Sequence, residues 1–274
     1  MRRIAVALRR WHIGGPRPYP ARVDPNPDAD LTHLLRAWPH EPGRINVRII
    51  TGADGQPKIQ VRVELGILQL ETIGRPDGFR PEGRESLLHL VREREAEHRS
   101  GDREGPFLLS SDECAALREE SVQYYHRYVA LFVLEDFLGV VRDTSRNLEV
   151  FELCRRHGEA QQDREILEQF RPYVIMMRTR AQASLAMRAG QSRVALASID
   201  AGLEELRQAF VDRGHADRYE QSSEVQVLRG LRDMLVPKLP SSQRMELEER
   251  LRAAIAGENY ELAAILRDEL RMME

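Results

Sequence analysis

The stretch Ser110-Ser111-Asp112-Glu113-Cys114-Ala115-Ala116-Leu117 begins the part of the chain whose pattern decides the fold. Ser110 and Glu113 have the spacing of a capping box, in which the serine hydroxyl and the glutamate carboxylate each accept a backbone amide hydrogen bond. Apolar residues then recur at helical spacing, among them Leu117, Tyr124, Tyr128, Leu131, Phe137, Val140, Val141, Leu148 and Phe151. Segment 107–236 is therefore predicted to be a helical domain, and the fold class to be mostly α.

Glycine and proline divide this pattern into separate helices. Gly158, Gly190 and Gly214 lie where the residue after a helix is expected, often in a left-handed conformation. Pro172 predicts a helix start or a kink close by, because proline is tolerated in the first helical turn and not in the interior. The first two helices are expected at 112–131 and 134–157.

Small residues flank the turn at Gly190-Gln191. They let two antiparallel helices approach closely, and the segment from 178 to 210 resembles one tetratricopeptide repeat in this respect, without the large aromatic residue near its start. An ordinary helical bundle with small residues at the crossings is the alternative. Ala183 and Ala186 precede the turn, and Ala195, Ile199 and Gly202 follow it.

The preceding segment, 44–100, has a different period. Apolar residues alternate with polar ones on both sides of a turn at Asp54-Gly55, which predicts antiparallel strands. At Gly66 the alternation shifts by one residue, as a β-bulge or a kinked corner would shift it. The alternating residues are Ile45, Val47, Ile49, Ile59, Val61, Val63 and Leu65, followed after the shift by Leu68 and Leu70.

A helix is expected to begin near Arg84, with Leu87, Leu88 and Val91 as its apolar stripe. It can cover the sheet, which gives a small α+β unit at 44–100. The charged stretch 92–104 is interpreted as a tether to the helical domain.

Residues 1–43 contain half of the 14 prolines and are predicted to form an extended arm, because proline supplies no amide donor. Its arginines outnumber its acidic residues. Trp11 and Trp38, together with this positive charge, could contact nucleic acid by stacking and charge. The alternative is that both tryptophans clamp the arm onto the domain behind it.

The composition of the 274-residue chain excludes several classes of protein. The net charge of -3 gives no general attraction to nucleic acid or to anionic membranes. Cys114 and Cys154 lie far apart, with no paired-cysteine motif, so we expect neither a zinc ribbon nor a disulfide framework, and a reducing cytoplasm is the default compartment. No apolar run is long enough for a signal peptide or a membrane helix, which predicts a soluble protein with no membrane partner.

No group of residues predicts catalysis, a metal site or a cofactor. The histidines are scattered, and Glu119 and Glu120 near His126 are interpreted as solvated helix charges. The loop Gly74-Arg75-Pro76-Asp77-Gly78 is the best candidate for a ligand site outside the helices, with Arg75 and Asp77 as binding residues. The alternative is a tight turn in which the aspartate caps its own backbone.

The last segment, 241–274, has the pattern of a two-helix hairpin. Leu247, Leu251, Ala254 and Ile255 form one helical stripe, and Gly257 can end that helix. Asn259 can cap a returning helix on which Leu262, Leu266 and Leu270 continue the stripe, while Ala263 and Ala264 allow a close crossing.

The run Glu258-Asn259-Tyr260-Glu261-Leu262-Ala263-Ala264-Ile265-Leu266-Arg267-Asp268-Glu269-Leu270 closely resembles the UVR motif of the repair proteins UvrB and UvrC and of certain Clp-protease-associated proteins. The resemblance implies binding of another protein or of a second copy, since UVR hairpins pair with one another. The protein's own helical domain is a third way to cover the stripe. The protein-binding residues implied are Leu247, Leu251, Ile255, Tyr260, Leu262, Ala263, Leu266, Arg267 and Leu270.

The rest of the chain departs from those proteins. It has no phosphate-binding G-x-x-x-x-G-K-[ST] loop and no paired cysteines. Segment 60–78 instead resembles an uncharacterised bacterial family with a C-terminal UVR motif, which implies no known activity. We therefore expect a non-enzymatic interaction or scaffold protein, with a homodimer among the expected forms. The alternative is an accessory factor of bacterial DNA repair that contacts nucleic acid only through the basic arm.

Overall fold

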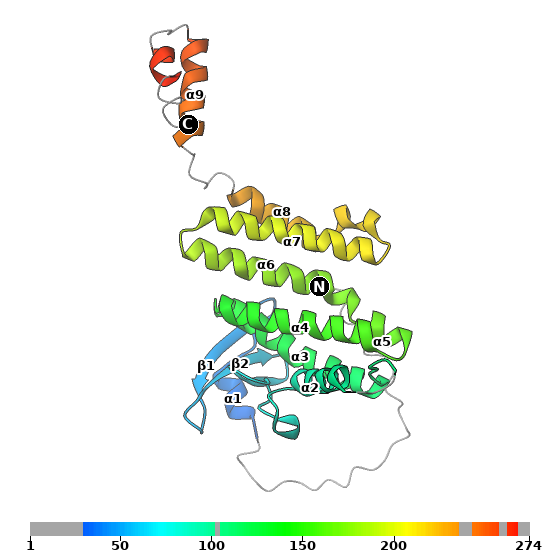
Figure 1. Cartoon of the computed structure of the whole chain (residues 1–274). Coiled ribbons are helices and arrows are strands. Elements are labelled where there is room, and N and C mark those ends of the chain that lie inside the picture. Colours follow the sequence, from blue (N-terminus) through cyan, green and yellow to red (C-terminus); the bar gives the residue numbers. More distant parts are fainter. Residues whose placement is uncertain (1–29, 102–104, 236–242, 258–261, 268–274) are drawn as a thin grey trace, which may run out of the picture.

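A computed structural model describes residues 30–101, 105–235, 243–257 and 262–267 of the chain. The protein is mostly helical, with a small antiparallel sheet near the N-terminus, as predicted (Figure 1). In chain order the elements are α1 (Thr32–Ala37), β1 (Asn46–Thr51), β2 (Pro57–Val63), β3 (Gly66–Glu71), α2 (Leu87–Ser100), α3 (Ser111–Val133), α4 (Phe137–His157), α5 (Gln161–Glu165), α6 (Arg171–Arg188), α7 (Ser192–Asp212), α8 (Ser223–Leu235) and α9 (Gln243–Ala256).

The sheet has the strand order β1-β2-β3 and both pairings are antiparallel. The expectation of a bulge at Gly66 is wrong. Val63 pairs with Gly66, so Glu64 and Leu65 form a two-residue turn and Gly66 is the first residue of β3. The alternation shifts because Leu65 belongs to the turn, where it is 92% exposed, and not to a strand.

The two faces of β2 are both covered, by different parts of the chain. Ile59 is fully buried in the main core, whereas Arg62 is buried on the other face and donates through Nε to the carbonyl oxygen of Trp38 at 2.7 Å. The guanidinium carbon of Arg48 lies 4.1 Å from the centre of the Trp38 ring. Trp38 therefore clamps the segment before the sheet onto β1 and β2.

Helix α1 corrects the prediction of an extended arm. The arm has no proline between Pro27 and Pro39, so a short helix can form there. The Thr32 amide donates a hydrogen bond of 2.8 Å to the Asp30 carboxylate, which stabilises the start of this helix. Trp11 and the rest of residues 1–29 lie outside the described residues.

Helix α2 is longer than predicted. Ser86 caps it by accepting from the His89 amide, and it continues to Ser100, so the tether expected from Arg92 onward is wrong over its first part. Its charged side chains are compatible with a helix that has one solvated face; Arg99, for example, pairs with Glu95 one turn earlier at 2.9 Å.

The capping box at the start of α3 is confirmed. The Glu113 amide donates to Ser110 Oγ at 3.3 Å, and the Ser110 amide donates to Glu113 Oε2 at 2.9 Å. Pro172 lies in the first turn of α6, also as predicted. Gly158, Gly190 and Gly214 each follow a helix, as predicted. Gly190 and Gly214 have left-handed φ values of +71° and +67°, whereas Gly158 has a φ of -57°.

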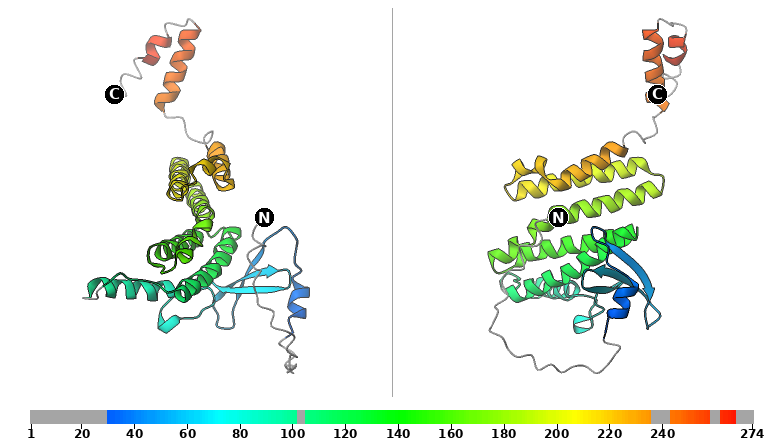
Figure 2. Two further views of the ribbon diagram at one scale, coloured as in Figure 1. Left: turned by 90° about the vertical axis from the view of Figure 1, so that its right-hand side faces the viewer. Right: turned by 180° about the vertical axis from the view of Figure 1, so that it is seen from behind.

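The long helices form a stack in which each one packs on the next along the chain. α3 contacts α4, α4 contacts α6, α6 contacts α7 and α7 contacts α8, with a further contact between α6 and α8 (Figure 2). The predicted close approach of α6 and α7 is confirmed: a Cβ placed on Gly202 would lie 2.2 Å from Thr179 Oγ1. Ala183, Ala186 and Ala195 are buried in the same region.

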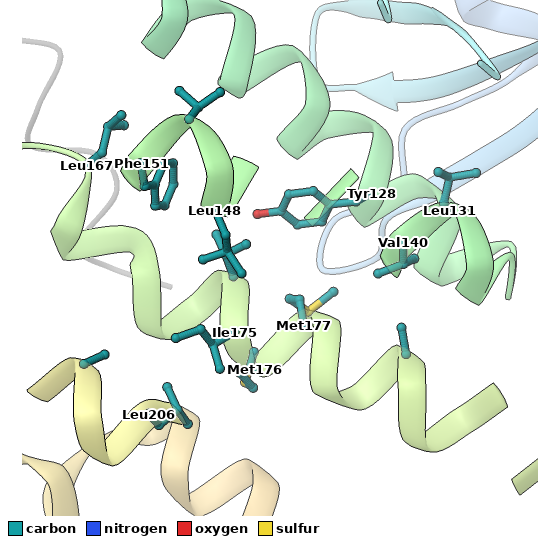
Figure 3. Packing of buried hydrophobic residues seen from close by; sticks show 14 of the residues in the cluster. Tyr128, Leu131, Val140, Leu148, Phe151, Leu167, Ile175, Met176, Met177 and Leu206 are labelled. Atoms are coloured by element: carbon teal, nitrogen blue, oxygen red, sulfur yellow. The ribbon is translucent and has the colours of Figure 1, made fainter. Parts of the chain in front are cut away.

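One hydrophobic core extends from Ile59 and Leu70 of the sheet, through Leu88 of α2, to Leu235 of α8. Figure 3 shows its centre, where side chains of α3, α4, α6 and α7 converge. The sequence pattern predicts the sheet unit and the helical domain as separate units, but in the structure they share this core. Among the described helices none is long and apolar enough to cross a membrane.

Candidate functional site

The C-terminal hairpin has a small buried cluster of its own. Ala254 of α9 and Ala263 and Leu266 of the helical residues 262–267 are buried together, with Leu251 packed against them. Ala263 is buried in the cluster, as expected for a residue at the crossing of the two helices, whereas Ala264 is only half-buried. Leu251, Ala263 and Leu266, which the resemblance implies as partner-binding residues, thus contribute to the inside of the hairpin.

Other apolar residues of the hairpin lie on its surface. Ile255 is 53% exposed, Leu262 is 38% exposed and Ile265 is 55% exposed. Arg267 is exposed as well. Ile265 was missed as a candidate, although its spacing of three residues from Leu262 on a helix could have identified it.

Three further hairpin candidates have no described side chain. Tyr260 and Leu270 lie outside the described residues, and Leu247 lies in a part of α9 where only the backbone is described. Asn259 also lies outside them. Gly257 follows α9 directly, as predicted, and its φ lies outside the left-handed region.

The loop after β3 turns inward onto α3. Arg75 Nε lies 3.0 Å from Asp77 Oδ1, and Arg75 Nη1 lies 3.3 Å from Glu120 Oε2 of α3. Gln123, one turn further along α3, donates to the second oxygen of Asp77 at 2.9 Å. The loop is therefore docked by its two candidate ligand-binding residues.

The backbone of this loop fits the tight-turn alternative. The Phe79 amide donates to Asp77 Oδ1 at 2.9 Å, so the aspartate caps its own turn. Gly74 and Gly78 have φ of +65° and +74°, where a side chain would be strained. The observed contacts of Arg75 and Asp77 thus hold the loop in shape and are internal to the protein.

A buried ionic network continues from the loop into the helices. The carboxylate of Glu120, fully buried, accepts from the Leu87 amide at 2.9 Å and from Arg146 of α4. The guanidinium of Arg146 lies over the ring of Tyr124, 3.7 Å from its centre. Charges removed from water need such partners, so Glu120 is a structural group here and not a solvated one as the sequence indicates.

Two polar clefts flank α4. The larger, of about 630 Å³, lies between α4, α5, α6 and α7, and the smaller, of about 380 Å³, lies between α2, α4 and α6. Glu152 lines both, and it pairs with Arg155 at 2.7 Å and with Arg171 at 3.7 Å. The sequence does not identify these clefts, because their charges come from helices far apart in the chain.

Comparisons with protein-family models, with curated proteins and with solved structures find no significant match to this chain. Among the described residues, no group of three or more histidines, cysteines, aspartates or glutamates is placed to hold a metal ion.

The described part of the arm offers one observation on nucleic-acid binding. Arg48 already covers a face of the Trp38 ring, and the Trp38 carbonyl is bonded to Arg62. These contacts fit the clamp interpretation for Trp38. Binding of nucleic acid by the arm stays a prediction, to be tested by salt-dependent DNA binding that is lost on deletion of residues 1–43.

Proposed function

We propose that this chain is a non-enzymatic interaction protein that binds a protein partner, or a second copy of itself, through its C-terminal hairpin. The observation that carries the proposal is the exposure of Ile255 and Ile265, at 53% and 55%, on a unit with few buried residues. Covering such side chains removes apolar surface from water, which favours association. The resemblance of residues 258–270 to the UVR motif supports the same function.

The small size of the hairpin adds a physical reason. Its buried cluster consists of Ala254, Ala263 and Leu266, with Leu251 half-buried beside them. Units below about 40 residues seldom bury enough surface to fold unassisted. A bound partner would supply the missing contacts, and binding and hairpin stability are then linked.

The helical stack suits the role of a scaffold in this proposal. Each long helix packs mainly on its neighbours along the chain, as in repeat proteins, where such stacking builds an extended support. A tetratricopeptide-like organisation of α6 and α7 belongs to the proposal and is supported by the close contact of Gly202 with Thr179.

The test compares the full-length protein with the double variant Ile255→Glu, Ile265→Glu. Analytical ultracentrifugation gives the mass of each, and a crosslinked pulldown from native lysate gives the bound proteins. We expect the double variant to sediment as a monomer and to lose the partner, because two buried carboxylates oppose docking.

Leu65→Glu is the matched control, since Leu65 is apolar and 92% exposed but lies in the β2–β3 turn. It should behave as the parent does. The proposal is wrong if the double variant keeps both the parent's mass and its bound proteins.

A further inference from the structure

The fold brings together the two cysteines of the chain, which lie 40 positions apart in the sequence. Cys114 is in the first turns of α3 and Cys154 is in the last turn of α4, and these helices pack on each other. The two thiols lie close enough to shift each other's pKa. Both side chains are buried, with 0% and 1% exposure.

Backbone contacts fix this arrangement at the adjoining helix ends. The Leu109 amide donates to the His157 carbonyl at 2.7 Å, and the Glu159 amide donates to the Leu109 carbonyl at 2.9 Å. Leu109 and Gly158 are the partners of this bridge. Cys114 lies five residues after Leu109 in the sequence, and Cys154 lies four residues before Gly158. The bridge therefore holds the two cysteines at the same level of the helix pair.

Hydrogen bonds from Asp163 of α5 hold the first turns of α3, where Cys114 lies. Asp163 accepts from Ser111 Oγ at 2.6 Å and from Arg118 Nη1 at 2.7 Å. Arg118, Asp163 and Glu113 are the charged groups that act on the Cys114 thiol. The Arg118–Asp163 ion pair therefore lies near the Cys114 thiol.

We propose that Cys114 and Cys154 form an intramolecular disulfide when the protein meets a peroxide, and that this bond locks the end of the α3–α4 pair. Nothing in the proposed partner binding of the hairpin is required for it. Each oxidation consumes one peroxide and both thiols, and it yields one disulfide and two molecules of water.

The two thiols have different roles in this step. The Cys114 thiolate attacks the peroxide, which breaks the O–O bond, gives a sulfenic acid on Cys114 and releases hydroxide. Cys154 then attacks that sulfur and displaces the sulfenic oxygen as water, with the proton of the Cys154 thiol. The interaction with Cys154 lowers the pKa of Cys114, whereas the interaction with Cys114 and burial raise the pKa of Cys154, which fits Cys114 as the attacking group.

The thiols are reached by local opening, because neither is exposed. α5 is a single short helix, and short peripheral elements open more easily than a core. A small oxidant such as hydrogen peroxide can then enter, whereas a bulky alkylating reagent enters more slowly. The native protein is therefore expected to oxidise before it is alkylated.

The experiment treats the full-length native protein with hydrogen peroxide, followed by intact mass measurement and peptide mapping. We expect a loss of two hydrogens per chain, one peptide pair joined through Cys114 and Cys154, and no alkylation of either thiol after denaturation. The midpoint of thermal unfolding should rise by roughly 5–10 °C, because the bond closes a long loop, and reductant should reverse the rise.

Cys114→Ser and Cys154→Ser are the matched variants, and neither should show the loss of mass or the shift. The mapped peptides of the parent decide the question even if a serine variant folds poorly. The proposal is overturned if both cysteines are recovered as free thiols, if the crosslink forms only in denaturant, or if it joins two chains.

Discussion

The guanidinium of Arg127 makes two hydrogen bonds with the carboxylate of Asp143, of 2.7 and 2.9 Å, where both side chains are at most 1% exposed. Arg127 lies in the second half of α3 and Asp143 in the first half of α4. Arg127 also donates to the carbonyl oxygen of Glu71, the last residue of β3, at 3.0 Å. One ion pair therefore ties the sheet to the first two helices of the stack.

We expect Asp143→Ala to destabilise the protein by about 3–5 kcal/mol, because it leaves a buried guanidinium without its counter-charge. Urea unfolding followed by circular dichroism measures the loss. The double variant Arg127→Met, Asp143→Leu should recover most of it, since apolar residues of similar volume often replace a buried ion pair at little cost.

An exposed ion pair provides the comparison. Arg207 pairs with Glu204 on the surface of α7, and Arg207→Ala should change the unfolding midpoint very little, because exposed pairs contribute little. Equal losses for Asp143→Ala and Arg207→Ala would show that the buried pair has no special role.

Gly202→Ala should destabilise the stack by about 1–3 kcal/mol, although alanine favours helices more than glycine does. The added methyl group would lie 2.2 Å from Thr179 Oγ1, so α6 and α7 would have to separate. Thermal unfolding measures the loss, and Thr179→Ala in the same chain should restore part of it by making room.

Gly230 in α8 is the matched control. A Cβ there meets no atom within 4 Å, so Gly230→Ala should stabilise the protein by up to about 1 kcal/mol through helix propensity alone. If both alanine variants stabilised the protein, the close crossing at Gly202 would be contradicted.

The helices could be predicted because their signals are local. The capping box of Ser110 and Glu113, the position of Pro172 and the small residues near Gly190 each act within a few residues of the chain. The sheet could be predicted for the same reason, since alternation is read directly from β1 and β2. The ends of the elements were predicted less well. Helix α2 continues to Ser100 through residues predicted as a tether, and Gly66 begins β3 where a bulge or a corner was predicted.

The features that position side chains could not be predicted, because they join distant residues. Arg75 pairs with Glu120, and Arg127 pairs with Asp143, against the rule that charged residues lie on the surface. The contact of Cys114 with Cys154 depends on how α3 and α4 align. The candidates of the hairpin and of the loop at Arg75 and Asp77 followed from local patterns, and the structure divides the hairpin candidates between a buried and an exposed set.

Arg62→Met should loosen the clamp at Trp38. Arg62 is buried and donates to the Trp38 carbonyl and, at the β2–β3 turn, to the Gly66 carbonyl at 3.1 Å. Its loss leaves buried acceptors unpaired, at a cost of about 1–3 kcal/mol. In a Trp11→Phe background Trp38 is the one remaining tryptophan, so under selective excitation of tryptophan a red-shifted emission and stronger acrylamide quenching would report the loosening.

Arg36 serves as the control for this measurement, because it is an exposed arginine of α1 itself. Arg36→Met should leave the Trp38 emission as in the parent. Equal quenching in the parent and the Arg62→Met protein would contradict the clamp.

The stability of the protein should fall as the pH drops below about 6.5, in part because of His126 in α3. Burial lowers the pKa of His126 from its ordinary value of 6.5, so the unfolded chain binds a proton more readily than the folded protein. The contribution is complete above pH 6.5 and is lost as the pH falls toward the lowered pKa. His126→Phe should weaken this decline in urea unfolding between pH 7.5 and pH 5, whereas a substitution at exposed His33, such as His33→Gln, should leave it intact. An unchanged decline in His126→Phe would assign it to other groups.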